Sequence, residues 1–350
     1  MPSYGFPTGM SINPIRDPSK SAGDQVKTSI EKNTSQSRIP LLKYTKISNR
    51  FFSYFGADMA IGLVFFNPSK SVRLLMNYLY TVEKLKSANI PYYTVEVVYN
   101  ECKEIDDAIH IKAREENVMF QKEKLCRMLE KKIPIKFSKL LFMDADIVFE
   151  NPLFYSETSR LLNDYDIVQP FTTAKWLNAS YNTVIQERKT AVLMNTNLPY
   201  DSLNYHPGFA WAFKRSWFKK VGFYEYAITG SGDTLSVAAW LQILPSPVSI
   251  VPAAVETYKE FFLLVAKHKP TMTCASGAVL HLWHGKHAKR QYVNRHTILH
   301  EIGNVKDILE ETDKGIFDFK YGRDHEDFKA VENVSLRLKK YFQDREDDEV

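Results

Sequence analysis

Short apolar runs alternate with amphipathic stretches through the middle of the chain. Residues 61–66 and 139–143 are short apolar runs, which are typical of strands buried on both faces, and residues 93–99 alternate as a strand does. Between them, apolar residues recur at helical spacing from 72 to 82 and from 116 to 131. The order strand, helix, strand, helix, strand implies right-handed crossovers, so we expect an α/β fold with a largely parallel sheet.

The pattern is less regular around this core. Asn67-Pro68 is a candidate cap and first residue for the helix that follows it. The polar stretch 172–203 has no clear period, and long segments of this kind are usually binding loops or lids. We expect further strands at 166–169, 208–213 and 278–282, and helices at 215–220 and 233–241.

The two ends of the chain differ from its middle. Residues 1–50 lack a sustained apolar period and cannot bury enough surface to offset the entropy of ordering, so we expect a flexible or poorly ordered tail. Residues 51–300 are expected to form the main domain and residues 301–350 a helical extension. Five of the last seven residues are acidic, which predicts a solvated end.

Composition narrows the class of protein. With 44% hydrophobic and 13% aromatic residues, the chain can bury a substantial core, and its net charge of +5 is too mild to indicate a nucleic-acid partner. Cys102, Cys126 and Cys274 are few and far apart, which favours a reducing compartment over a disulfide framework. No apolar stretch has the length of a signal-peptide core or of a membrane span. We therefore expect a cytoplasmic protein without a membrane span.

The run 139–143 ends on two carboxylates, Asp144 and Asp146. Ligands of open α/β sheets bind at the carboxyl ends of strands, and hard oxygen ligands suit Mg²⁺ or Mn²⁺. The pair predicts a divalent cation and, with it, a phosphorylated substrate. An acidic pair that only caps a turn is the alternative.

A second candidate follows the expected strand 278–282. His281 at its end could complete a metal site with the two carboxylates, and Lys286, Lys289 and Arg290 could neutralise a diphosphate. His281, His284 and His287 could instead bind zinc, although no fourth ligand is evident nearby. A purely structural role for each histidine is a further alternative.

Two other features could contribute to such a site. Gly230-Ser231-Gly232-Asp233-Thr234 precedes a helix, where glycines let a ligand approach the backbone and Asp233 either accepts a proton from a hydroxyl or caps the helix. Trp176, Trp211 and Trp283 could stack on sugar or base rings, or belong to the core. Lys122 either reaches a phosphate or lies on a solvated helix face.

Together these residues resemble the GT-A class of nucleotide-sugar glycosyltransferases, in the order that the family has them. Asp144-Ala145-Asp146 resembles the family's Asp-x-Asp motif, the segment that begins at His206 is similar to the acceptor half of inverting, galactosyltransferase-like members, and His281-Leu282-Trp283-His284-Gly285 resembles a late histidine of the metal site. The resemblance covers roughly residues 60–300. It implies a Rossmann-like nucleotide-sugar-binding sheet flanked by helices.

The resemblance also implies roles for individual residues. Asp144, Asp146 and His281 would bind Mn²⁺ or Mg²⁺, with His281 preferred over His284 because it directly ends the strand. Asp233 would be the base, although the second acidic residue usual beside it is missing. The donor would contact Asp144, Lys122, His284, Gly285, Lys286 and Lys289, and the acceptor would contact Trp211, His206 and Gly232.

The function implied is transfer of a sugar from a nucleoside-diphosphate donor, most often a UDP-hexose, to a hydroxyl of a glycan, with inversion. A haloacid-dehalogenase-like phosphatase is an alternative, because Asp144-Ala145-Asp146-Ile147-Val148 also fits its motif, with Asp144 as nucleophile. A sugar-binding module without catalysis is another. A nucleotidyltransferase would share the sheet and the metal, but no Gly-rich phosphate loop follows the first strand.

Overall fold

The structure is a computed structural model that describes residues 44, 58–194, 196–245, 249–320 and 328–349. The predicted tail, residues 1–50, lies outside the described residues except for Tyr44. The ring of Tyr44 packs on Phe154 with centroids 4.9 Å apart, and its hydroxyl accepts a hydrogen bond of 2.9 Å from the Phe149 amide. No helix among the described residues is long and apolar enough to cross a membrane.

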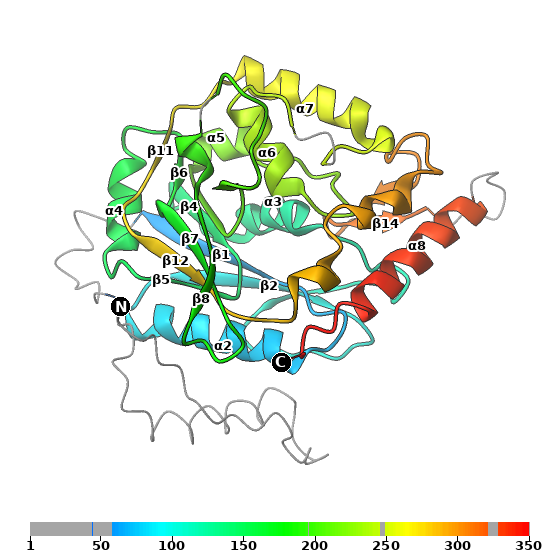
Figure 1. The fold of residues 1–350 in the computed structure, drawn as a ribbon, viewed down its shortest axis with the longest axis horizontal. Helices are drawn as coiled ribbons and strands as arrows, with labels where there is room; N and C mark the ends of the chain where they lie inside the picture. The colour runs from blue at the N-terminus through cyan, green and yellow to red at the C-terminus, as the bar shows by residue number, and fades with distance from the viewer. Residues whose placement is uncertain (1–43, 45–57, 195, 246–248, 321–327, 350) are drawn as a thin grey trace, which may run out of the picture.

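A seven-stranded sheet forms the centre of the molecule, in the order β3-β2-β1-β4-β10-β6-β11 (Figure 1). Neighbouring strands are parallel except for β10, which is antiparallel to both β4 and β6. The strands are β1 (Met59–Phe65), β2 (Tyr92–Val98), β3 (Ile109–Lys112), β4 (Lys139–Met143), β6 (Ile167–Gln169), β10 (Ala210–Lys214) and β11 (Met272–Cys274). The expected α/β class, a Rossmann-like sheet flanked by helices, is confirmed.

Helices cover both faces of this sheet, which explains the apolar runs. In β4, Leu140 and Phe142 point into the core on one face, whereas Leu141 and Met143 point into the core on the other. A strand buried on both faces has no polar positions to alternate with its apolar ones. One face is covered by α2 (Val72–Ser87) and α4 (Phe154–Leu161), and the other by α3 (Lys122–Lys132), α5 (Arg215–Lys220), α6 (Gly232–Trp240) and α7 (Val255–Lys267).

A second sheet of five strands, in the order β5-β12-β7-β8-β9, stands beside the first. Its strands are β5 (Ile147–Phe149), β7 (Thr173–Leu177), β8 (Val184–Thr190), β9 (Tyr205–His206) and β12 (Ala278–His281). Only three residues, Asp144, Ala145 and Asp146, separate β4 of the first sheet from β5 of the second.

The last part of the chain packs against the main core. The last elements are the hairpin β13 (Leu309–Glu311) and β14 (Phe317–Phe319) and the helix α8 (Phe328–Gln343). Short 3-10 helices connect earlier elements, at Ala191–Leu193, Pro252–Ala254, His287–Arg290 and Asn294–Leu299. Val334, Leu338 and Phe342 of α8 share one hydrophobic cluster with residues of α3 and the central sheet. After α8 the chain turns back to the start of α2 (Figure 1).

Three expectations from the sequence are corrected here. The helix α2 begins at Val72 with Ser71 as its cap, because the Asn67 side chain binds the backbone of Ser71 at 2.9 and 3.0 Å instead of capping at its own position. The helix expected at 116–131 begins at Lys122. The preceding residues are held against β14, where Asn117 Nδ2 donates to the Phe317 carbonyl at 2.8 Å.

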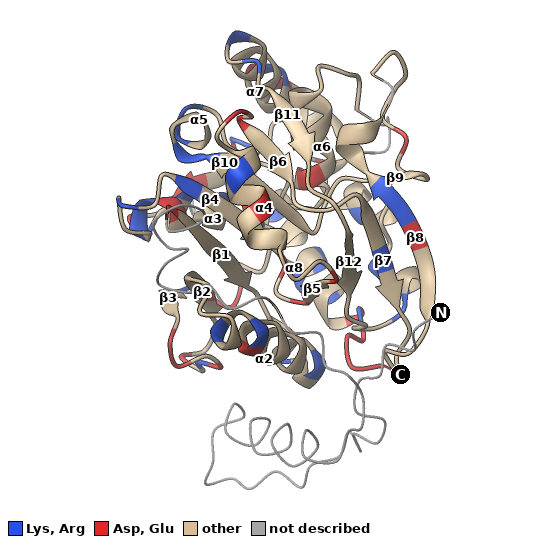
Figure 2. Ribbon diagram, turned by 90° about the vertical axis from the view of Figure 1, so that its left-hand side faces the viewer, with Lys and Arg blue, Asp and Glu red and all other residues tan. Residues whose placement is uncertain are grey.

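The stretch 172–203 is the third correction, since it contains β7 and β8 instead of a loop. Along Val184–Thr190, half-buried and exposed side chains alternate until the buried last residue, and Figure 2 shows basic residues on both strands. An antiparallel edge with one wet face can carry polar residues at most positions, so its apolar signal is weak.

Candidate active site

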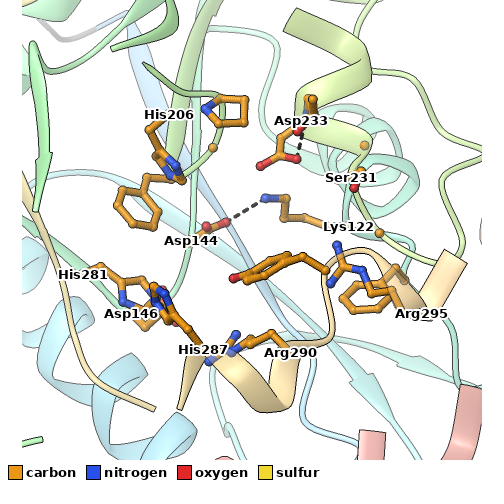
Figure 3. Close-up of a pocket in the computed structure, with 18 of the residues that line it drawn as sticks. Lys122, Asp144, Asp146, His206, Ser231, Asp233, His281, His287, Arg290 and Arg295 are labelled. Carbon is orange, nitrogen blue, oxygen red and sulfur yellow. Dashed lines mark hydrogen bonds and ion pairs between the residues drawn. The ribbon is translucent and has the colours of Figure 1, made fainter. Parts of the chain in front are cut away.

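A cavity of about 480 Å³ lies at the carboxyl ends of β1 and β4 (Figure 3). Both sheets, α3, the start of α6 and the segments after β12 and α8 contribute to its walls. Its charged and titratable lining comprises the acids Glu123, Asp144, Asp146 and Asp233, the bases Lys122, Arg188, Arg290, Arg295 and Arg345, and the histidines His206, His281, His284 and His287.

The carboxylates of Asp144 and Asp146 face different partners. The amide of Asp144 donates to the Phe209 carbonyl at 2.7 Å, and its carboxylate accepts a hydrogen bond of 2.9 Å from Lys122 Nζ. Asp146 faces the histidines that follow β12 instead. Asp144 and Asp146 therefore point to different sides of the cavity, Asp144 to Lys122 and Asp146 to the histidines.

Asp146, His281 and His284 form one compact group. Asp146 Oδ2 lies 2.8 Å from His284 Nε2 and 3.6 Å from His281 Nε2, and the two ring nitrogens are 3.1 Å apart. The register explains this convergence, because His281 of β12 pairs with Ile147 of β5 and the amide of Leu282 donates to the Asp146 carbonyl at 2.8 Å.

This group fits a divalent cation. One ligand atom from each of its three residues lies within 4.8 Å of the others, and the second oxygen of Asp146 is buried without a hydrogen-bond partner among the described residues. Burial, reinforced by Arg290 and by the neighbouring histidines, holds the pKa of His281 well below its usual range, so its ring is neutral and can offer a lone pair. A carboxylate with two imidazoles is a donor set for a transition-metal ion.

Lys122 lies between three carboxylates on the other side of the cavity. Burial by itself lowers the pKa of its ammonium, but Asp144, Glu123 and Asp233 together raise it. The sequence left open a solvated helix face for this residue, whereas the side chain points into the cavity and is paired there (Figure 3).

Asp233 projects into the cavity from the first turn of α6 (Figure 3). The cap position of this helix is Ser231, with φ of 71°, so Asp233 is not the N-cap. One of its oxygens accepts from the Thr234 amide at 2.8 Å. The other lies so close to Gly208 that a Cβ there would stand 2.5 Å from it.

Glu123 is a further acid of this wall that the sequence did not single out. Its carboxyl group occupies the space beside Gly232, where a Cβ would lie 2.5 Å from Glu123 Cδ. Burial raises the pKa of Glu123 to about 7, against the opposing effect of Lys122. A second acidic side chain is thus present near Asp233, although it comes from α3 and not from the neighbouring sequence position.

Of the three residues expected at the acceptor, two line the cavity and one lies in the core. His206 lines the cavity, and both its ring nitrogens are buried without a hydrogen bond among the described residues. Burial holds its pKa well below the usual range, so the neutral ring offers one donor and one acceptor. Gly232 also lines the cavity, whereas Trp211 is 2% exposed in the core and donates to the Pro207 carbonyl at 2.7 Å.

The residues expected at the donor are likewise divided. Asp144, Lys122 and His284 line the cavity, but Gly285, Lys286 and Lys289 do not. These three face the last residues of the chain, where Lys286 pairs with Glu349 and Lys289 pairs with Glu346 at 2.9 Å. Gly285, with φ of 84°, is needed there because a Cβ would lie 2.8 Å from the Glu346 carbonyl oxygen.

The arginines of the cavity were mostly invisible to sequence reasoning. Arg188 belongs to β8, which the sequence did not predict, and its guanidinium stacks 5.3 Å from the Trp176 ring. Arg295 and Arg345 come from segments beyond the last predicted core strand. Glu187, Arg188 and Lys189 are consecutive charged residues, so the sequence of β8 has no apolar–polar alternation that could have placed Arg188 toward a site.

No protein-family model and no curated protein sequence matches this chain. Solved structures do match over much of its length. The catalytic domain of Drosophila β1,4-galactosyltransferase 7, in complex with xylobiose, aligns with a TM-score of 0.32 and 13% identity, over 62% of this chain and 64% of that one. This chain therefore spans somewhat less than two thirds of that domain.

Glucosyl-3-phosphoglycerate synthase from Mycobacterium tuberculosis is a second match. Its complex with Mg²⁺ and uridine diphosphate aligns with a TM-score of 0.34 and 10% identity, over 69% of this chain and 79% of that one. Its complex with Mn²⁺, UDP-glucose and phosphoglyceric acid aligns with a TM-score of 0.36 and 9% identity, over 80% and 94%. At such low identities and TM-scores, these similarities say nothing about the activity of this chain. The activity has to be argued from the site itself.

Proposed function

We propose that this protein is a metal-dependent glycosyltransferase. It would transfer a hexose from a nucleoside-diphosphate donor, a UDP-sugar, to a hydroxyl of a glycan, with inversion at the anomeric carbon. The observation that carries the proposal is one cavity with a cation-binding group, which has Arg290 beside it, and with a separate carboxylate, Asp233 (Figure 3). A diphosphate needs the first and an attacking hydroxyl needs the second.

Asp146, His281 and His284 would hold the cation, which when bound would supply positive charge for the diphosphate oxygens. Their two imidazole nitrogens favour Mn²⁺ over Mg²⁺, because Mg²⁺ prefers an all-oxygen shell. We propose Asp144 as an indirect contributor: its carboxylate fixes Lys122 in the cavity, where the ammonium can approach the donor.

The proposed reaction is a single displacement. The acceptor oxygen attacks the anomeric carbon and forms the new glycosidic bond, while its proton passes to a carboxylate oxygen of Asp233. The bond from the anomeric carbon to the diphosphate oxygen breaks, and its electron pair leaves with the nucleoside diphosphate. Lys122 and Arg290 offset the charge that develops there.

His206 and Gly232 are the proposed acceptor contacts. The unpaired ring nitrogens of His206 suit sugar hydroxyls, which both donate and accept hydrogen bonds. Trp211 is proposed only as support for the wall, since it lies in the core. Gly285, Lys286 and Lys289 are proposed to support the site indirectly, because they hold residues 346–349 in place.

The cytoplasmic location expected from the cysteines stays a prediction.

Isothermal titration calorimetry against a panel of nucleoside-diphosphate sugars, with Mn²⁺ and with chelator, tests the donor. We expect one donor to bind only with metal. Asp233→Asn should then remove turnover and leave the donor affinity unchanged. Absence of binding across the panel would contradict the proposal and favour the phosphatase or the sugar-binding module, and an active Asp233→Asn variant would contradict the assignment of the base.

A further inference from the structure

The last described residues of the chain are anchored beside the cation-binding group, contrary to the solvated end that their acidity predicts. Asp348 accepts hydrogen bonds from the Ser71 hydroxyl at 2.7 Å and the Arg73 amide at 2.8 Å, at the start of α2. Trp283 Nε1 donates to the Glu349 carbonyl at 3.0 Å. Figure 1 shows the C-terminus next to α2. Asp347 directly precedes these two anchored residues.

Asp347 is buried, with 4% of its surface exposed, because cations surround its carboxylate. Its Oδ1 lies 3.0 Å from Arg345 Nη2, 3.3 Å from His284 Nδ1 and 3.6 Å from Arg290 Nη2. Each of these three nitrogens can donate a hydrogen bond, so the carboxylate of Asp347 serves as their acceptor.

The two nitrogens of His284 face opposite sides. Nε2 is directed at Asp146, at 2.8 Å, and Nδ1 is directed at Asp347. A neutral imidazole carries one proton, so Nε2 can offer its lone pair to a cation only when Nδ1 is protonated. Nδ1–H then needs an acceptor, and Asp347 is the side chain that supplies one.

Arg290 acts in the opposite sense. Its Nη2 lies 2.7 Å from His284 Nδ1 and 3.0 Å from His284 Nε2, and a guanidinium can only donate. A bond to Nδ1 requires that nitrogen to be unprotonated and so places the proton on Nε2, whereas a bond to Nε2 occupies the lone pair that a cation would use. Asp347 therefore favours cation binding by His284, and Arg290 opposes it.

We infer that Asp347 is a positioning residue for the cation site: it holds His284 with Nδ1 protonated and Nε2 turned toward Asp146, and so makes the end of the chain part of that site. The inference rests on the proposed function, because it concerns the same cation. Carboxylates that orient metal-binding histidines in this way are worth about 10- to 100-fold in metal affinity.

The test is a Mn²⁺ titration of the full chain, with free Mn²⁺ followed by electron paramagnetic resonance. Asp347→Ala removes the acceptor, and we expect Mn²⁺ to bind about 10- to 100-fold more weakly. Asp347→Asn keeps an oxygen that can accept from Nδ1–H, so it should restore part of the affinity. Asp344→Asn is the matched control, since it removes one negative charge three residues earlier, from a side chain that is 46% exposed and pairs with Lys340; its affinity should equal that of the wild type.

Thermal unfolding without metal accompanies the titration, and the Asn variant should unfold close to the wild type. Equal Mn²⁺ affinity in wild type, Ala and Asn variants would overturn the inference, as would an equal loss in Asp347→Asn and Asp344→Asn, which reports net charge only. Tighter binding in the Ala variant would show that Asp347 competes with the ligand and would also overturn it. If the wild type itself binds no Mn²⁺, the proposed function fails together with the inference.

Discussion

The buried carboxyl group of Glu123 should make the stability of this protein depend on pH. Its pKa is raised from 4.5 to about 7, first because of burial, with Asp233 adding to the shift and Lys122 opposing it. Between these two values the folded protein binds more protons than the unfolded chain, so the free energy of unfolding falls as the pH rises. The perturbation that isolates this effect is Glu123→Gln, which keeps the shape and removes the charge.

The size of the effect follows from the shift. A rise from 4.5 to about 7 corresponds to roughly 3 kcal/mol, and 6% exposure of Glu123 leaves little solvent to screen it. We expect the Gln variant and the wild type to be equally stable near pH 4.5. The variant should become progressively more stable than the wild type as the pH approaches 7, and the difference should level off near pH 8 at roughly 3 kcal/mol.

Urea unfolding of both proteins at intervals from pH 4.5 to 8 measures the difference. Glu116→Gln is the control, since this exposed glutamate lies just before α3 and should change stability by less than about 0.5 kcal/mol at any pH. A difference that stays flat across the range, or a variant that is less stable than the wild type at pH 8, would refute the reasoning. It would mean that Lys122 keeps Glu123 ionised in the folded protein.

Three further predictions concern the site and its support. Asp146→Asn should reduce Mn²⁺ affinity by more than about 100-fold, whereas Asp144→Asn should retain Mn²⁺ binding because its carboxylate pairs with a lysine; loss in both would favour a shared site. Gly208→Ala should lower kcat roughly 100-fold with donor affinity unchanged, because the new Cβ displaces Asp233, and wild-type kcat would contradict its role as base. Arg215→Met should cost roughly 3–5 kcal/mol in urea unfolding, because it leaves a buried glutamate and four carbonyls without their partner; a loss below 1 kcal/mol would be inconsistent with this.

Much of the central sheet could be predicted because both of its faces are buried. Strands such as Lys139–Met143 and helices such as Arg215–Lys220 lie where the apolar pattern placed them. The pattern failed where neighbours in space decided the structure. Asn117 is bound to β14, and α3 begins later than the sequence predicts. The side of β8 that faces solvent carries polar residues, so this strand has no clear apolar pattern in the sequence.

The candidate site was predictable only in its sequence-local parts. A strand-end acidic pair and a histidine at the end of a late strand are recognisable because ligands of α/β sheets bind at strand ends. What joins them is the antiparallel pairing of β12 with β5, which places His281 opposite Ile147. The division of the pair between Lys122 and the histidines depends on register, which the sequence does not show. Asp347 could not be predicted for another reason: an acidic end is normally solvated, and the contacts of Asp347 with Arg290 and His284 depend on the tertiary fold.

The three-residue connection between β4 and β5 has a consequence for how such a site can change. Asp144 follows the last residue of β4 in the first sheet, and Asp146 precedes the first residue of β5 in the second sheet. The two carboxylates are therefore positioned by the hydrogen bonds of two different sheets. Substitutions around Asp233 can reshape the proposed acceptor region without altering the register that brings His281 to Asp146. If the proposed function holds, libraries aimed at new acceptors should vary the surroundings of Asp233 and of His206 on β9, and leave the pairing of β5 with β12 intact.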